Sequence, residues 1–211
     1  MSSRINRFLA LATAVLLVLV GISAMDSKNE ATAADASRFD PGLIISDSVF
    51  YDFGTMTVAD IQRFLESKVP VCKANDGGPT CLRDYVTDEL EKVGEDGKCQ
   101  SMPAKQNVKA SQIIYDIARA CGINPRVLLV VLQKEQGLVQ ATNPTAYMYR
   151  AALGYGCPDS DPGICGKVWS GLFNQLYKGA GQLQWYNDPR GSFTTLKVGK
   201  TSNIRYHPNA S

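Results

Sequence analysis

The segment 122–139 constrains the fold most strongly, because it combines signals for a helix start with an unbroken apolar run. Asn124 can cap a helix, and Pro125 suits the first helical position, where its missing N–H would be unpaired in any case. Residues 127–132 are all apolar, which is more than one face of a surface helix needs. We therefore expect a helix that is buried on most sides and against which the rest of the chain packs.

A carboxylate lies near the end of this expected helix. Glu135 follows Leu128, Val131 and Leu132 by seven, four and three positions, so it shares their face. A carboxyl group on an apolar face loses hydration, which favours its neutral, proton-holding form. Such a group can act as a general acid in the cleavage of a sugar bond. The spacing also allows Glu135 to turn to solvent at the helix end.

Residues 1–33 have the composition of a targeting segment. Arg4 and Arg7 supply positive charge, residues 8–25 carry no charge, and the Ala-Thr-Ala at 31–33 has the form of a cleavage site. The uncharged run is also close to the minimum for a membrane span, so an uncleaved N-terminal anchor is the alternative to a signal peptide. In both cases the remainder would be secreted or held in the cell envelope.

All six cysteines follow this segment, and an even count in an exported chain predicts three disulfides. Six cysteines allow 15 pairings. We favour sequential pairing, because it closes two short loops that contain Gly and Pro. The favoured pairs are Cys72–Cys81, Cys99–Cys121 and Cys157–Cys165. With one histidine, His207, and no Cys-x-x-Cys pair, we expect neither a metal nor another cofactor.

The charge pattern limits the possible partners. The chain has a formal net charge of +2 and no run of Lys or Arg, so nucleic acid is not an expected partner. A membrane is expected as a partner only through an uncleaved N-terminal segment. No linker rich in Pro, Ser or Gly separates residues 34–108 from residues 109–211. We therefore expect both regions to pack in one domain.

The apolar periodicity predicts a mainly α fold with little strand. Thr57 and Asp60 resemble a capping box, and Gly122 follows a strongly periodic stretch as a helix-ending residue. Besides the Glu135 helix, helices are expected over 57–69, 82–93, 109–121 and 168–186, and two short strands over 192–206. The helix over 109–121 and the Glu135 helix would form a hairpin that carries the acid at its end.

Three tyrosines follow the Glu135 helix and precede a loop rich in Gly, Pro and Asp. They are Tyr147, Tyr149 and Tyr155. Aromatic faces stack on sugar rings, and phenol hydroxyls can bond to sugar hydroxyls. These tyrosines are therefore candidate substrate-binding residues, although each could equally be a half-buried packing residue.

The sequence from Asn124-Pro125 to Glu135-Gln136-Gly137 resembles the catalytic helix of the lysozyme-like superfamily. Lytic transglycosylases and bacterial glucosaminidases of that group carry a similar Glu-Ser-Gly ending, and Gln136 stands here in place of the Ser. The Gly-Ala-Gly-Gln-Leu-Gln at 179–184 resembles the Gly-Leu-Met-Gln segment of transglycosylases.

A second resemblance covers roughly residues 39–211. The segments 152–160 and 171–175 are similar to a group of exported actinobacterial proteins that are labelled haemagglutinin-like or glucosaminidase-like. The two resemblances imply a lysozyme-like helical domain with disulfide-clamped loops, a glycan cleft and one essential acid.

The resemblance implies roles for individual residues. Glu135 matches the catalytic acid and would protonate the glycosidic oxygen between N-acetylmuramic acid and N-acetylglucosamine in peptidoglycan. Gln136 and Gln182 lie in the two matching motifs and are candidate substrate contacts, as is Asp159 in the clamped loop. No cofactor is implied.

The number of carboxylates separates the possible mechanisms. A transglycosylase needs no second acid, because the 6-hydroxyl of the substrate closes a 1,6-anhydro ring. A hydrolase uses a second acid at about 5–5.5 Å for retention or about 6.5–9.5 Å for inversion. Asp159 and Asp161, followed by Asp188, are the candidates for that role, but each is better explained as structural or solvated. A single-acid mechanism, or one assisted by the acetamido group of the substrate, fits better.

Two functions from different classes remain open. One is an exported enzyme that cleaves the glycan strand of peptidoglycan with Glu135. The other is a glycan-binding or adhesive envelope protein that keeps the fold without cleaving. An ion pair between Glu135 and Lys134, Arg126 or Arg150 would favour the second, because a nearby cation stabilises the ionised carboxylate. A purely structural envelope protein is a weaker third possibility, and a Ser–His–Asp or Cys–His hydrolase has little support.

Overall fold

The computed structural model describes residues 35–40, 43–158 and 165–191. The chain divides into two compact units, one ending at Ile44 and the other beginning at Ile45. The first unit contains the short 3-10 helix η1 (Ala36–Arg38). Several predictions fall outside the described residues and stay untested. They concern the expected targeting segment at 1–33, the candidate acids Asp159 and Asp161, the expected strands at 192–206, and His207.

The second unit is mainly helical, which confirms the predicted fold class. Its helices are α2 (Asp47–Phe50), α3 (Val58–Lys68), α4 (Ala110–Cys121), α5 (Pro125–Gln136), α6 (Ala146–Arg150) and α7 (Leu172–Asn187). Its two strands, β1 (Val86–Glu89) and β2 (Lys105–Lys109), pair antiparallel.

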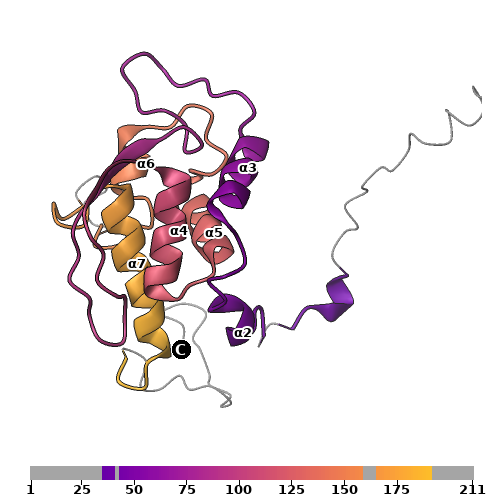
Figure 1. Ribbon diagram of the computed structural model, residues 1–211. Coiled ribbons are helices and arrows are strands. Elements are labelled where there is room, and N and C mark those ends of the chain that lie inside the picture. The colour runs from indigo at the N-terminus through magenta and orange to yellow at the C-terminus, as the bar shows by residue number, and fades with distance from the viewer. Residues whose placement is uncertain (1–34, 41–42, 159–164, 192–211) are drawn as a thin grey trace, which may run out of the picture. The chain divides into compact units, whose positions relative to one another are not determined.

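Helix α4 is the centre of this unit, with α7 on one side and α3 and α5 on the other (Figure 1). The predicted apolar stripe, whose residues recur every three or four positions, is completely buried. It consists of Ala110, Ile113, Ile114, Ile117, Ala118 and Cys121. The core residues that surround α4 are Ile61 and Leu65 of α3, Leu128 and Leu132 of α5, and Leu172, Leu176 and Ala180 of α7. Burial of this apolar area provides the main driving force for folding.

The predicted ends of α3, α4 and α5 are confirmed. Thr57 and Asp60 form a reciprocal capping box at the start of α3. The side chain of Asn124 accepts a hydrogen bond from the backbone N–H of Arg126 at 2.9 Å. Helices α4 and α5 end at Gly122 and Gly137, each with a φ of 63°, a left-handed conformation that costs glycine little.

Helix α5 is less buried than the sequence predicts. Leu128, Leu129 and Leu132 lie in the core, but Val130 is 64% exposed. The outer face of α5 borders a groove of about 290 Å³ between α3 and α5. The six apolar residues therefore cover the core face and one wall of this groove, instead of being enclosed on all sides.

Two other predicted helices differ from the structure. The prediction of a helix over 82–93 is wrong. This segment contains β1 instead, in which Val86 and Thr87 pair with Lys109 and Val108 of β2. Leu90 and Val93 are exposed, so the segment has no continuous apolar stripe to bury as a helix. The helix expected from residue 168 begins at Leu172 instead, since Gly171 has a φ of 96° and breaks it.

The structure contains three disulfides, and they join the cysteines in the sequential pairs that we favoured. They are Cys72–Cys81, Cys99–Cys121 and Cys157–Cys165. The Cys99–Cys121 bond ties the loop after β1 to the last residue of α4. Among the described residues, no helix has both the length and the apolar content that a membrane crossing requires.

Candidate functional site

Glu135 lies in the last turn of α5, directly before the residues that end the helix. Its Oε2 atom lies 3.7 Å from the position that a Cβ on Gly154 would occupy. The side chain is 33% exposed, so it is partly screened by protein and still reachable from solvent. The Glu135 carboxyl group therefore lies beside the backbone of residues 153–155, which we call the glycine segment, at the end of the α4–α5 hairpin.

Lys134 contacts this carboxyl group. Its Nζ atom lies 2.7 Å from Oε1 of Glu135. This contact is one of the ion pairs that would favour glycan binding without cleavage. However, Lys134 is 75% exposed, and an exposed ion pair between neighbouring residues contributes only about 0–1 kcal/mol.

A buried glutamine holds the segment beside Glu135. Gln175 of α7 accepts hydrogen bonds through Oε1 from the backbone N–H groups of Leu153 and Tyr155, at 3.1 and 3.0 Å. Its Nε2 donates to the carbonyl oxygens of Tyr155 and Trp169, at 2.7 and 2.8 Å. Gln175 is completely buried, so these bonds fix the loop from two directions. The signal for this role was an uncharged amide on the apolar face of a helix, which the sequence analysis did not use.

The predicted substrate residues lie in different surroundings. Gln136 is half-buried next to Glu135. The rings of Tyr155 and Trp169 meet edge to face with centroids 5.9 Å apart, and Tyr155 also borders a small cavity that Gln182 lines. Tyr147 is half-buried, with the Arg150 guanidinium 5.7 Å from its ring centroid. The structure therefore brings Tyr155 and Gln182 together, with Tyr155 one residue beyond the glycine that faces Glu135.

The structure does not fit the prediction that Tyr149 binds substrate. It is only 3% exposed, and its ring stacks on Tyr85 with centroids 3.8 Å apart. Its hydroxyl donates to the carbonyl oxygen of Thr80 at 2.6 Å. Burial raises the pKa of this phenol well above its usual value. Tyr149 is a packing residue, because neither its face nor its hydroxyl is available to a sugar.

Asp188 is also misplaced for the role of a second acid. It follows α7 and binds Arg190, whose hydrogen bonds lower the pKa of the Asp188 carboxyl to about 2. With a helical rise of about 1.5 Å per residue, Asp188 lies roughly 20 Å along α7 from Gln175, which packs near Glu135. At this distance, the carboxyl groups of Asp188 and Glu135 cannot both act on the same glycosidic bond.

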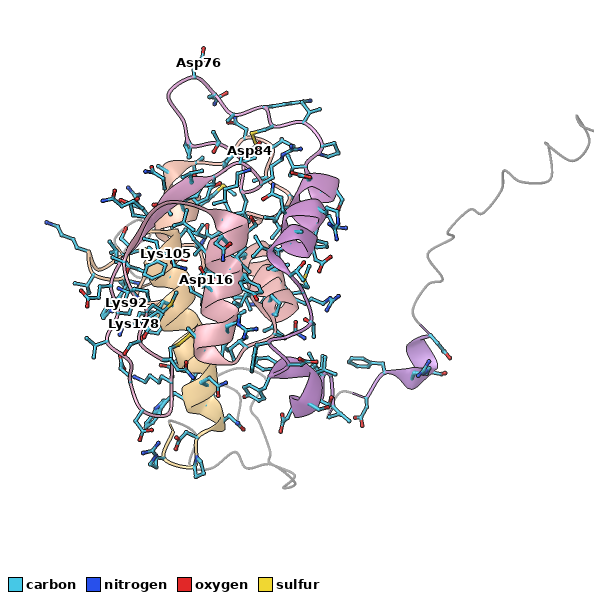
Figure 2. The ribbon with its side chains drawn as sticks, viewed as in Figure 1. Asp76, Asp84, Lys92, Lys105, Asp116 and Lys178 are labelled. Carbon is cyan, nitrogen blue, oxygen red and sulfur yellow. A yellow bond between two sulfur atoms is a disulfide. The ribbon has the colours of Figure 1, made fainter. Side chains whose placement is uncertain are left out.

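A second carboxyl cluster, which the sequence analysis missed, joins β1, β2 and α4. The Glu89 side chain is fully buried, and in this cluster it contacts Lys105 as an ion pair without a well-formed hydrogen bond. The Nζ atom of Lys105 lies 3.3 Å from Oε2 of Glu89 and 2.5 Å from Oδ2 of Asp116. Figure 2 labels Lys105 and Asp116. Desolvation by burial raises the pKa of Glu89, and the nearby Asp116 charge raises it further. No group of three or more potential metal ligands occurs in the described part of the chain.

Comparison with known proteins gives one match. The model of the family described as LasA, N-terminal domain, matches residues 43–185, which is more than half of the chain. No curated protein and no solved structure matches significantly. The family and the three disulfides together indicate an extracellular, cell-wall-related protein. The chain belongs to the family of the LasA N-terminal domain.

Proposed function

We propose that this protein binds the glycan strand of peptidoglycan at the end of the α4–α5 hairpin and cleaves it with Glu135 as its single general acid. The observation that supports the proposal best is the position of Glu135. Its carboxyl group stands at a helix end, partly exposed, beside a glycine segment that the buried Gln175 holds in place. A fixed backbone next to an acid is what positions a substrate oxygen for proton transfer.

The proposed reaction needs one carboxyl group, which first donates a proton and then regains one. Glu135 donates its proton to the glycosidic oxygen as the bond to the anomeric carbon breaks. The 6-hydroxyl of the muramic acid residue then attacks that carbon and forms the 1,6-anhydro ring. Its proton returns to the Glu135 carboxylate. Tyr155 and Gln182, which lie close together next to the glycine segment, would contact the sugars on one side of the broken bond.

The test is digestion of purified peptidoglycan, with the products identified by mass spectrometry. Glu135→Gln keeps the shape of the side chain and removes the transferable proton. Glu91→Gln is a matched control, because Glu91 is an exposed glutamate of the loop after β1. We expect the wild type and the control to release muropeptides with anhydro ends and Glu135→Gln to release none. Reducing ends would replace the transglycosylase route with hydrolysis, and release by Glu135→Gln would overturn the proposal.

The contact with Lys134 favours a second candidate, a protein that binds the glycan without cleaving it. In that case the ionised Glu135 would accept hydrogen bonds from sugar hydroxyls, as carboxylates do in many polar contacts. The wild type would then sediment with peptidoglycan and release no fragments. Glu135→Gln would weaken this sedimentation without altering any product.

A further inference from the structure

A long groove runs along the C-terminal half of α4. Two cavities, of about 650 and 350 Å³, share the lining residues Phe53, Gln100, Arg119 and Ala120, so they form one continuous depression. We call it the α4 groove. It ends at Gly122, just before α5 starts, whereas Glu135 lies roughly 15 Å further along α5. The groove is therefore distinct from the Glu135 site.

Arg119 lies at the middle of the α4 groove, because it lines both cavities. Its guanidinium carbon lies 5.5 Å from the ring centroid of Phe53 and 5.6 Å from that of Tyr115. Within the described part of the chain, the Arg119 side chain has neither a hydrogen bond nor an acidic partner. The two rings restrict the guanidinium in advance and leave its N–H donors unused.

Each acidic side chain that lines the groove already contacts a cation. Glu95 contacts Lys98 and Lys178. Lys105 contacts Asp116 at 2.5 Å at one end. At the other end Arg190 contacts Asp96 and Asp188, at 2.7 and 2.6 Å. Among the described residues that line the groove, Arg119 is thus the cation without an acidic contact, and it lies at the centre. An ordered guanidinium with free donors is suited to a carboxylate, which it can bind through two parallel hydrogen bonds.

Neutral amides also line the groove. Gln100 and Asn187 border it, and among the described residues their side chains make no hydrogen bond. Side-chain amides both donate and accept, which matches the alternating N–H and C=O groups of a peptide. The larger cavity alone, of about 650 Å³, lies within the range of small-ligand pockets and accommodates several linked residues.

We propose that the α4 groove binds an extended peptide that carries a carboxylate, and that Arg119 holds this carboxylate. The extracellular, cell-wall-related family favours the stem peptide of peptidoglycan as the source over an acidic segment of another protein. This binding is independent of Glu135 and of any cleavage of the glycan.

Isothermal titration calorimetry with the full chain tests the proposal. The probe is the synthetic stem peptide L-Ala-D-isoGlu-L-Lys-D-Ala, compared with the same peptide after both carboxylates are converted to amides. We expect amidation to weaken binding by about tenfold or more, the range for a lost hydrogen bond between charged groups. Arg119→Gln should weaken binding of the free peptide as much, and Arg119→Lys should fall between, because it keeps the charge and loses the planar fork.

Two controls separate this site from the rest of the molecule. Arg63→Gln removes an exposed arginine of α3 that pairs with Asp60, and it should leave binding unchanged. Glu135→Gln should also bind the peptide normally, so a failure of the proposed cleavage does not affect this test. Circular dichroism shows whether Arg119→Gln folds. If it does not, the proposal is tested by comparing how strongly the wild type binds the free and the amidated peptide.

Three results would overturn the proposal. The first is equal binding of the free and the amidated peptide, and the second is the absence of binding to the wild type. The third is binding of the acidic peptide acetyl-Ala-Ala-Glu-Ala-Ala-amide but not of the stem peptide, which would assign the groove to a protein partner.

Discussion

At the residue scale, the organisation of the candidate site depends on one uncharged side chain. Gln175 satisfies the backbone groups of Leu153, Tyr155 and Trp169 without bringing a charge into the core. A buried amide of this kind is costly to remove, because each backbone group that it leaves unpaired keeps the full penalty of desolvation. The position of the segment beside Glu135 therefore depends on a buried residue of α7.

Replacing Gln175 by Leu should lower the free energy of unfolding by about 2–4 kcal/mol, since several buried backbone groups lose their partners. Chemical denaturation followed by circular dichroism measures this change. Gln182→Leu is the control, because Gln182 is half-buried in the same helix and should change stability by less than about 1 kcal/mol. Equal losses for both variants would show that Gln175 has no special role.

Glu89 makes stability depend on pH. Its pKa is raised in the folded state by burial and by Asp116 of α4, against the opposing charge of Lys105 of β2. The charged residue within α7, Lys178, contacts Glu95 instead. A raised folded pKa means that the contribution of Glu89 is complete below its unfolded pKa of about 4.3 and is lost as the pH rises through the folded pKa.

Glu89→Gln removes this titration, so the stability of the variant relative to the wild type should increase between pH 4.5 and pH 8. Urea denaturation at a series of pH values measures the difference between the two free energies of unfolding. Glu91→Gln, at an exposed position, should show a difference that does not vary with pH. A constant difference for Glu89→Gln as well would contradict the assignment.

At the element scale, the helix ends follow from local chemistry and the strands do not. The capping box of α3, the Asn124 cap of α5 and the terminal glycines all lie within four residues of the groups they satisfy, so the sequence was sufficient to predict them. Strand β1 depends on pairing with residues 105–109, about 20 positions away, and its local pattern of Val86, Leu90 and Val93 resembled a helix.

Some features of the candidate site also follow from neighbouring residues, whereas others depend on residues far away in the sequence. The position of Glu135 at a helix end follows from the residues around it. The burial of Tyr149 does not, because it is set by Tyr85 and Thr80, which lie more than 60 positions earlier in the chain. The Lys134 contact and the Gln175 network likewise depend on how side chains meet after folding.

The capping box gives a prediction for α3. Thr57→Ala removes the hydroxyl that accepts from the Asp60 N–H, and it should lower the free energy of unfolding by about 1 kcal/mol. Ser67→Ala removes an exposed hydroxyl from the last turn of the same helix and should change stability by less than about 0.5 kcal/mol. Thermal denaturation of the two variants makes the comparison, and a larger loss for Ser67→Ala would contradict it.

At the scale of the whole molecule, the disulfides close loops of different lengths. Cys99–Cys121 closes a separation of 22 residues and is buried against the core, whereas Cys157–Cys165 closes 8. A crosslink that closes the longer loop restricts the unfolded chain more, by about 1 kcal/mol for these two lengths. The first bond therefore contributes more to the stability of the α4 and α7 packing.

Replacing both Cys99 and Cys121 by Ala should lower the free energy of unfolding by about 3–5 kcal/mol. Replacing Cys157 and Cys165 by Ala should cost about 1 kcal/mol less, and its main effect should be on the loop beside the candidate site. Denaturation of both double variants under oxidising conditions measures the two losses. A greater loss for the Cys157 and Cys165 pair would contradict this ranking.

The most direct test of the account is a time course of muropeptide release by the wild type and Glu135→Gln, at equal amounts of protein bound to peptidoglycan. Equalising the bound protein separates cleavage from binding. The account predicts that the substitution lowers the release rate by at least about 100-fold, the low end for the loss of a general acid. Equal release by both proteins, or release by neither while both bind, would contradict the assignment of Glu135 as the catalytic acid.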